Sequence, residues 1–396
     1  MVTNNEQNKL NVPHLRFPEF HGEWEKCKLG DIATLTKGSG ISKDQRSATG
    51  TPCILYGELY TTYKSEVINY VVSKTDISDK NLVRSCANDI IIPSSGETAI
   101  DISTARCVLS PDVLLGGDLN IIRLKDGDGR FFSYQLNGVR KHDIAKIAQG
   151  VSVVHLYGES IKGLTVSFPS NKEQQKISTL LSLIDERIAT QSKLIEDLKK
   201  LKCAIIETEY NSKGQEYRIG DIIEQKSLRN KSNLVKTVLS VNNKLGFLNQ
   251  DEQFEDRIVA SEDTSNYKVV TKDDFAYNPA RINVGSIARL KSYDKGIVSP
   301  MYICFKVTDS IVPEYLESYF ATNQFFKEMQ KRLEGSVRLC LSFEGLCNIP
   351  VVIPNMDEQA EIGKRIHLLE NKIETECNIL SQYEKQKQYL LRQMFI

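Results

Sequence analysis

Two stretches of this 396-residue chain carry the same heptad pattern, which limits how the whole chain can fold. Within residues 169–210, and again within residues 354–396, apolar side chains recur at alternating steps of four and three. This spacing is typical of an α-helix that buries a narrow apolar seam against another helix. The predicted seam residues are Ile177, Leu181, Ile184, Ile188, Ile195, Leu198 and Ile205 in the first stretch, and Ile362, Ile366, Leu369, Ile373, Leu380, Tyr383 and Leu390 in the second.

We call the separation in sequence between Pro169 and Pro354 the repeat offset. When one stretch is displaced by the repeat offset, the two stretches align without a gap. Gly150 and Gly335 stand one repeat offset apart ahead of them. Matching residues occupy the pairs Glu173/Glu358, Gln174/Gln359, Ile177/Ile362 and Lys202/Lys387, the last being a polar break in each seam. We interpret this as an internal duplication.

The duplication divides the chain into a globule with an N-terminal arm (1–168), a helix (169–210), a second globule (211–353) and a final helix (354–396). Short β-branched and apolar runs alternate with turn residues in the globules, which predicts mixed α/β structure, with a helix over residues 131–149 in the first. The predicted fold class is therefore α+β. The two globules have diverged more than the helices, as expected if they recognise different things.

Each predicted long helix spans roughly 57 Å at 1.5 Å per residue, more than a small core requires. Its seam needs a partner, and the nearest one is its own copy. We favour an antiparallel coiled coil with pseudo-twofold symmetry, while parallel pairing stays open. The competing interpretation is a pair of ordinary bundle helices inside a larger core, against which the sustained heptad register argues.

Composition gives no global electrostatic signal, because 51 basic residues balance 51 acidic ones. Any surface that attracts nucleic acid must then be local. The nine cysteines form no CxxC pair, which suits reduced thiols and predicts no structural metal. No signal peptide and no 18-residue apolar run is found, so we expect a cytoplasmic protein without a membrane partner.

Catalytic motifs are absent from the sequence: there is no GxSxG, HExxH, Walker loop or GxGxxG, and no catalytic residue is predicted. The run Asn278-Pro279-Ala280-Arg281 begins like an adenine methyltransferase motif but departs from it at the third and fourth positions. A turn before Arg281 is the better interpretation. Pro93-Ser94-Ser95-Gly96 could expose a serine, but no histidine motif accompanies it.

Polar loops of the globules are the candidates for contact with nucleic acid. Arginine can donate two hydrogen bonds to guanine and asparagine can pair with adenine, whereas lysine and serine mostly contact phosphate. For each residue alone, a solvated surface side chain is the competing interpretation. The candidates are Lys37, Ser39, Lys43, Arg46, Arg106, Arg140, Lys141, Ser152 and His155 in the first globule, and Lys226, Arg229, Lys231, Arg281, Asn283, Arg289, Ser336 and Arg338 in the second.

The order of these features resembles the specificity subunit of type I restriction-modification systems over essentially the whole chain. The resemblance is carried by the opening around Trp24, by Lys28-Leu29-Gly30-Asp31-Ile32, by Gly335-Ser336 and by the Pro-x4-Gln motifs at 169–174 and 354–359. It implies a non-catalytic subunit with two target-recognition domains. Each would recognise one half of a split, asymmetric site on double-stranded DNA, and the helices would set the gap.

The same resemblance implies the partners. Two methyltransferase subunits would dock on the helices and motor-endonuclease subunits would join the full complex. S-adenosylmethionine, ATP and Mg²⁺ are expected in those partners and no cofactor in this chain. The alternative is a coiled-coil scaffold that joins two protein ligands and never contacts DNA. A methyltransferase and nuclease in one chain is disfavoured for lack of cofactor motifs.

Overall fold

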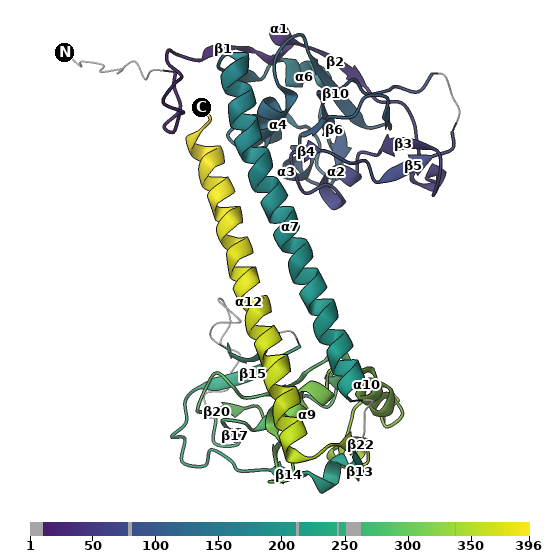
Figure 1. Ribbon diagram of the computed structural model, residues 1–396, viewed down its shortest axis with the longest axis vertical. Helices are drawn as coiled ribbons and strands as arrows, with labels where there is room; N and C mark the ends of the chain where they lie inside the picture. Colours follow the sequence, from purple (N-terminus) through teal and green to yellow (C-terminus); the bar gives the residue numbers. More distant parts are fainter. Residues whose placement is uncertain (1–10, 78–80, 211–213, 244, 251–262, 337) are drawn as a thin grey trace, which may run out of the picture. The chain divides into compact units, whose positions relative to one another are not determined.

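The computed structural model describes residues 11–77, 81–210, 214–243, 245–250, 263–336 and 338–396, and its contacts divide the chain into two units. Unit 1 comprises Met1–Ser192 and Asn378–Ile396, and unit 2 comprises Lys193–Cys377. The two cuts, after residues 192 and 377, are separated by the repeat offset found in the sequence. Each unit therefore contains one globule and part of both long helices, α7 (Asn171–Glu209) and α12 (Met356–Gln393) (Figure 1).

The sequence repeat is also a repeat of structure. The short helices α6 (Gly158–Lys162) and α11 (Phe343–Cys347) are displaced by the repeat offset at both ends, as are the strands β12 (Thr165–Phe168) and β22 (Pro350–Ile353). The first residues of α7 and α12 are also one repeat offset apart. β12 pairs antiparallel with β1 (Glu25–Lys28), and β22 pairs antiparallel with β13 (Gln215–Arg218). β1 and β13 are the first strands of their globules.

The two long helices are antiparallel in each unit. In unit 1 the N-terminal part of α7 packs against the C-terminal end of α12, with Ile184 and Leu390 in one core. In unit 2 the arrangement is reversed, with Ile206 near the C-terminal end of α7 sharing a core with Ile362. This observation decides between the two pairings that the sequence left open. All fourteen predicted seam residues are buried or half-buried.

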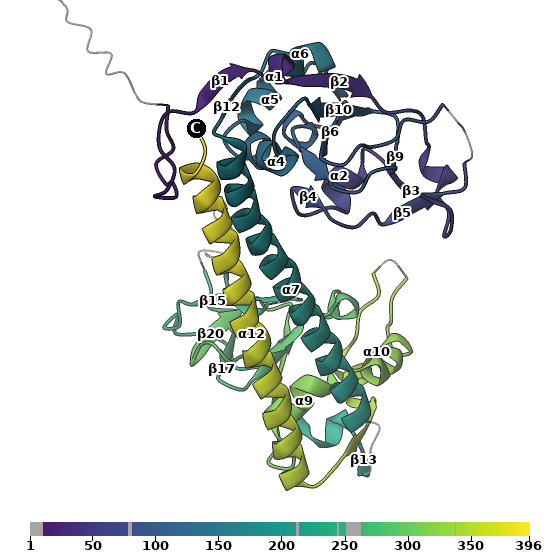
Figure 2. The same ribbon diagram turned by 45° about the horizontal axis from the view of Figure 1, so that its top comes forward.

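Globule 1 is built on a five-stranded sheet with the order β2 (Ala33–Lys37), β10 (Leu119–Leu124), β6 (Asp89–Pro93), β8 (Arg106–Val108) and β4 (Val67–Ile68). Helix α4 (Gly129–Asn137) packs on β6 and β8. Ile90, Ile92 and Ile122 face the core that contains α4 and α7, whereas Ile91 and Ile121 face a second core on the other side. A strand covered on both faces is expected to be apolar throughout. Figure 2 shows α4 between α7 and the strands β6 and β10.

The remaining elements of globule 1 surround this sheet. The strands are β2 (Ala33–Lys37), β3 (Thr51–Ile54), β4 (Val67–Ile68), β5 (Ser73–Thr75), β6 (Asp89–Pro93), β7 (Ser95–Gly96), β8 (Arg106–Val108), β9 (Leu114–Leu115), β10 (Leu119–Leu124) and β11 (Val154–His155). The helices are α1 (Leu29–Ile32), η1 (Lys43–Gln45), α2 (Glu58–Thr61), α3 (Ala99–Ile102), α4 (Gly129–Asn137) and α5 (Lys141–Ile147).

Globule 2 repeats the order of the central strands as β14-β21-β18-β19 and adds a second sheet, β16-β15-β20-β17. Its strands are β14 (Ile223–Lys226), β15 (Val238–Asn242), β16 (Gly246–Asn249), β17 (Lys268–Thr271), β18 (Phe275–Tyr277), β19 (Ile287–Arg289), β20 (Lys295–Val298) and β21 (Ile303–Val307). Its helices are η2 (Ile219–Asp221), η3 (Ile282–Val284), α9 (Pro313–Tyr319) and α10 (Asn323–Gln330).

The single helix predicted over residues 131–149 is wrong, because the structure divides it into α4 and α5. Gly138 ends α4, and its N–H donates to the Tyr134 carbonyl at 2.9 Å. Glycine in a helix interior costs about 1 kcal/mol relative to alanine, so a break there is inexpensive. Among the described residues, no helix is both long and apolar enough to cross a membrane.

Candidate nucleic-acid interface

Both globules present the same bridged loop just ahead of the duplicated helices. In bridged loop 1, Gln149 and His155 exchange two backbone hydrogen bonds of 2.9 and 2.7 Å. In bridged loop 2, Glu334 and Cys340 exchange two of 2.9 and 2.8 Å. Each partner in the second loop lies one repeat offset after its counterpart, so the two loops are copies of one structural feature.

A glycine begins the turn of each bridged loop. Gly150 has a φ of 124° and Gly335 a φ of 116°, a region that favours residues without a side chain. A Cβ at Gly150 would lie 2.1 Å from the Val153 carbonyl oxygen, and one at Gly335 would lie 2.3 Å from the Arg338 carbonyl oxygen. Each loop therefore depends on its glycine, which explains why Gly150 and Gly335 match at the repeat offset in the sequence.

Each bridged loop is anchored to the segment that follows a central strand. The N–H of Leu156 donates to the Ser94 carbonyl at 2.9 Å, and the N–H of Leu341 donates to the Pro279 carbonyl at 3.0 Å. These contacts also match at the repeat offset. The Pro93–Gly96 and Asn278–Arg281 runs thus occupy equivalent positions, although Ser95 and Gly96 form strand β7 whereas residues 279–281 form a turn. This favours the interpretation of Asn278–Arg281 as a turn rather than as part of a methyltransferase site.

Globule 1 also contains an open cleft of about 1000 Å³. One side is formed by the segment 40–46, which contributes Lys43 and Arg46, and the other by the segment 55–62, which contributes Tyr56, Glu58 and Tyr60. Basic and aromatic side chains that share one concave surface are suited to nucleic acid, because they can contact phosphates, base edges and base faces.

The family model for the type I restriction modification DNA specificity domain matches residues 21–200 and again residues 211–385. The chain belongs to this specificity family. The resemblance seen in the sequence is thereby confirmed, and both matches include one globule and most of the long helix that follows it. Members of the family are non-catalytic targeting subunits, so this chain is not an enzyme.

Known specificity subunits resemble the chain over nearly its full length. The type I restriction enzyme MjaVIII specificity subunit of Methanocaldococcus jannaschii is 23% identical and the alignment covers 98% of this chain and 94% of the relative. A crystal structure of the S subunit from M. genitalium has a TM-score of 0.63 at 19% identity, covering 97% of this chain and 99% of the other. A chain from a structural study of assembly and conformational transition in the type I R-M system has a TM-score of 0.54 at 12% identity, covering 93% and 96%.

Most of the predicted contact residues of this specificity subunit lie at the surface of their globules. Ser39, Asn283 and Lys141 are half-buried, and the Ser39 hydroxyl accepts a hydrogen bond of 2.7 Å from the N–H of Val83. The exposed ones are Lys37, Lys43, Arg46, Ser152, His155, Arg229, Lys231, Arg281, Ser336 and Arg338.

Arg106 is one of two predicted contact residues that are buried. Its side chain donates to the carbonyl oxygens of Leu59 and Tyr63 at 3.2 and 3.1 Å, and the residue is 8% exposed. Burial lowers the pKa of its guanidinium. Since phosphate could reach Arg106 only after these contacts broke, we assign it to holding the 59–63 segment and withdraw it from the interface.

Arg289 is the second predicted contact residue that is buried, and its side chain is 7% exposed. Its guanidinium lies 2.7 Å from Asp273, 2.5 Å from Glu314 and 3.0 Å from Glu317. Burial lowers the pKa of Arg289, but the two glutamates outweigh burial and the net pKa is raised. A fully surrounded cation of this kind stabilises globule 2 and is also withdrawn from the interface.

Two further candidates are held by neighbours inside their own units. The Lys226 ammonium donates to Thr271 Oγ1 at 2.8 Å and forms an ion pair with Asp274. Arg140 donates to the Ile396 carbonyl at 3.0 Å, which ties globule 1 to the end of the chain. Both are half-buried, so their charges are largely used within the protein.

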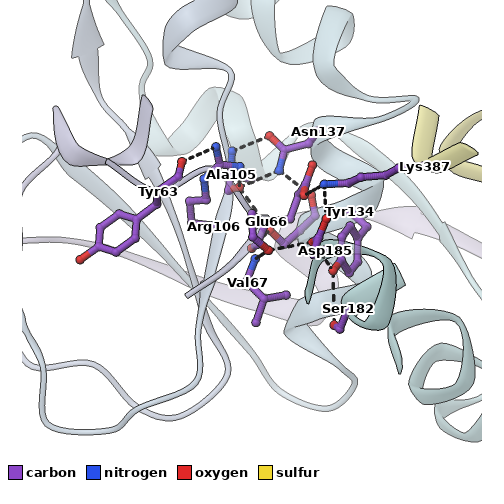
Figure 3. A network of polar contacts seen from close by, with 12 residues as sticks. Tyr63, Glu66, Val67, Ala105, Arg106, Tyr134, Asn137, Ser182, Asp185 and Lys387 are labelled. Carbon is purple, nitrogen blue, oxygen red and sulfur yellow. Dashed lines mark hydrogen bonds and ion pairs between the residues drawn. The ribbon is translucent and has the colours of Figure 1, made fainter. Parts of the chain in front are cut away.

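Lys387, predicted as a polar break in the α12 seam, is the centre of a buried network in unit 1 (Figure 3). Its ammonium lies 2.6 Å from Asp185 Oδ1 on α7 and also donates to Glu66 of globule 1. Tyr134 and Ser65 donate to the second Asp185 oxygen at 2.8 and 2.7 Å. The network joins both long helices to globule 1 at one point.

The electrostatics of this network keep Lys387 charged. Burial by itself lowers the pKa of the ammonium, but Glu66 and Asp185 outweigh it, and the net pKa is raised. Burial also raises the pKa of the Tyr134 hydroxyl, which therefore remains a donor to Asp185. The site is a structural cluster in which one ammonium is shared by two carboxylates.

Unit 2 contains the matching pair at the repeat offset. Lys202 of α7 donates to Glu370 of α12 at 2.5 Å, and Lys291 of globule 2 lies 3.9 Å from the same carboxylate. Lys202 corresponds to Lys387 and Glu370 to Asp185. Each unit therefore joins its two helices with one lysine and one acid, placed where the seam is polar.

Tyr56 and Tyr60 of the cleft were not predicted from the sequence. They lie in the run Leu55–Tyr63, which places three tyrosines around Gly57 and is too short for a heptad or a long strand pattern. The repeated tyrosines in this turn-rich segment are the sequence signal that could have indicated an interface, because tyrosine is suited to surfaces that are partly apolar and partly hydrated. Only the fold shows that Lys43 and Arg46 face the same cleft.

Proposed function

We propose that this specificity subunit directs a type I restriction-modification complex to a bipartite, asymmetric DNA site. Globule 1 recognises one half of the site and globule 2 the other, and α7 and α12 set the spacing between the halves. The observation that carries this proposal is one scaffold, repeated at a fixed offset, that presents different side chains in its two copies. Residues 55–72 connect β3 to β5 in globule 1, whereas residues 243–245 connect β15 to β16, which pair in the same way, in globule 2.

The proposed partners follow from the family and from the symmetry of the repeat. Two methyltransferase subunits bind the chain together with double-stranded DNA, and motor-endonuclease subunits complete the assembly. S-adenosylmethionine, ATP and Mg²⁺ belong to those partners. The proposal places the complex in the cytoplasm with the DNA. Local basic side chains, rather than net charge, would provide the chain's own share of DNA binding.

Exposed apolar residues at matching positions support docking of two identical subunits on the helices. Leu183 of α7 is 52% exposed and its counterpart Leu368 of α12 is 58% exposed. Leu194 and Ile379 form a second exposed pair at the same offset. None of the four is a seam residue. In unit 1, Leu183 and Tyr383 line a shallow groove of about 390 Å³ that a partner side chain could fill.

We expect Leu183→Glu to reduce the complex from two methyltransferase subunits to one. A carboxylate that must enter an apolar contact costs about 2 kcal/mol or more, and the equivalent position on α12 is unchanged. Leu368→Glu should have the same effect, and the double variant should bind neither subunit. Native mass spectrometry with the protein's own methyltransferase subunits measures the stoichiometry.

The matched control is Gln175→Glu, which adds the same charge at an exposed position of α7. It should leave two subunits bound. Retention of both subunits by the double variant would show that docking uses a different surface.

Exchanging part of globule 2 tests the division of labour between the globules. Residues 223–333, from the start of β14 to the residue before bridged loop 2, are replaced by those of another family member. This keeps the β13–β22 pair, the second bridged loop and both long helices intact. We expect one half of the methylated sequence to change and the other half and the spacer to remain, as measured by methylation-sensitive sequencing.

A change in both halves would contradict recognition by separate globules. The alternative, a scaffold that never contacts DNA, predicts a different result. In that case the exchanged chain would leave the methylated sequence unaltered, and a footprint with the purified partners would be independent of this subunit.

A further inference from the structure

One side of the cleft of globule 1 is formed by a segment that is much shorter in the sequence of globule 2. β3 pairs antiparallel with β5 and parallel with β9, and β15 pairs antiparallel with β16 and parallel with β20, so β3 and β15 are equivalent. Between β3 and β5 the chain inserts residues 55–72, including α2. Between β15 and β16 only residues 243–245 intervene.

This contrast separates what the two globules share from what distinguishes them. Features repeated at the repeat offset, such as the bridged loops, are suited to whatever is common to both half-sites, above all the phosphate backbone. A feature present in one globule is suited to what differs between half-sites, which is the base sequence. We propose that the cleft of globule 1 selects the base pairs of its half-site in the major groove, an inference that rests on the proposed function.

The charges in the cleft favour base edges over phosphates. Its lining contains two basic residues, Lys43 and Arg46, and two acidic ones, Glu58 and Asp118. Such a balanced surface would attract a phosphate weakly. Lys43 and Arg46 offer donors and the exposed Asp118 offers acceptors. Base edges in the major groove present the complementary pattern: guanine accepts from arginine, and the amino groups of cytosine and adenine donate to oxygen.

The cleft is held in shape by Glu58, which is only 6% exposed. One carboxylate oxygen accepts from the N–H of Leu55 at 2.8 Å and the other accepts from Ser73. Arg46 Nη1 lies 3.7 Å from the same carboxylate, and Arg46 Nε donates to the Lys43 carbonyl at 3.3 Å. Arg46 is thereby positioned while its side chain remains 40% exposed, as a specificity-determining arginine requires.

Tyrosines complete the cleft on the opposite side. Tyr56 is 37% exposed, and Tyr60 is half-buried with its hydroxyl 3.8 Å from the position that a Cβ on Gly57 would occupy. Rings at the edge of the cleft can contact the methyl group of thymine and the faces of bases. A volume of about 1000 Å³ is at the upper end for a ligand site, enough for the edges of more than one base pair.

The test compares Arg46→Ala and Tyr60→Ala, the latter removing the ring, with wild type in a strain that contains the protein's own methyltransferase subunits. Methylation-sensitive sequencing reports the methylated sequence. We expect Arg46→Ala to reduce the preference for the native base about tenfold or more. The reduction should affect at least one base pair and should be confined to a single half-site. The other half-site and the spacer should be unchanged. Arg46→Lys should restore the discrimination only in part, because lysine lacks the bidentate fork.

Arg338→Ala in bridged loop 2 is the matched control, and it should weaken methylation without altering the preferred bases. Equal thermal midpoints for all variants would show that they fold. If wild type directs methylation to a bipartite site and Arg46→Ala and Tyr60→Ala both leave its sequence unchanged, the cleft is not the recognition site. If wild type directs no methylation to such a site, the proposed function itself fails.

Discussion

Replacement of Lys387 by alanine is expected to destabilise unit 1 by about 3–5 kcal/mol, because two buried carboxylates lose their shared cation. Asp185 would keep its hydrogen bonds from Tyr134 and Ser65, but these donors supply no compensating charge to Asp185 or to Glu66. The free energy of unfolding, obtained from denaturant titration of the full chain, measures the loss.

Two variants separate this effect from a general loss of helix. Lys385→Ala, at an exposed position two residues earlier on α12, should change stability by less than about 0.5 kcal/mol. Lys387→Met combined with Glu66→Gln and Asp185→Asn should recover most of the loss, since removing a whole buried ion cluster is often close to neutral. If Lys387→Ala unfolded like Lys385→Ala, the cluster would have no role in holding globule 1 on the helices.

The pH dependence of the loss has a defined sign. The carboxylates raise the pKa of Lys387 above the value of about 10.4 expected in the unfolded chain. A raised pKa contributes stability that is fully present below the unfolded pKa and is lost as pH rises through the folded pKa. The difference between wild type and Lys387→Ala should therefore not be reduced between neutral pH and about pH 9, and should shrink only in strong alkali.

The sequence predicted the long helices and the repeat because both depend on local periodicity. It also located Lys202 and Lys387 as breaks in the seam. It could not show that Lys387 is enclosed by Glu66 and Asp185, which are distant in sequence. Two arginines, Arg106 and Arg289, illustrate the same limit, because only the three-dimensional fold reveals that their charges are satisfied internally.

Other features were beyond the sequence for different reasons. The break at Gly138 competes with an apolar pattern that continues on both sides, and the tertiary packing of α4 and α5 decides the outcome. The cleft of globule 1 requires the segments 40–46 and 55–62 to face each other, and neither contains a motif. Duplication was the strongest signal available, since it separated the shared scaffold from the residues that differ.

Removing one heptad from each long helix is expected to shorten the spacer of the methylated sequence by about three base pairs. The deletions are residues 191–197 of α7 and 376–382 of α12, which lie one repeat offset apart and leave Lys202, Lys387 and their partners in place. Seven residues shorten a helix by roughly 10 Å, and stacked base pairs are about 3.4 Å apart. The seam continues in register because a whole heptad is removed.

The rate of methylation should fall at the same time. Three base pairs turn one half-site by about a third of a turn relative to the other, since B-DNA has 10–10.5 base pairs per turn. A heptad, by contrast, returns an α-helix to within about 20° of the same face. Deleting residues 191–192 and 376–377 instead would turn the rest of each helix by roughly 200°, which displaces the seam, and should abolish methylation by unfolding the helix pair. If the variant that lacks one heptad in each helix folds and still methylates at the original spacing, the helices do not determine the distance between half-sites.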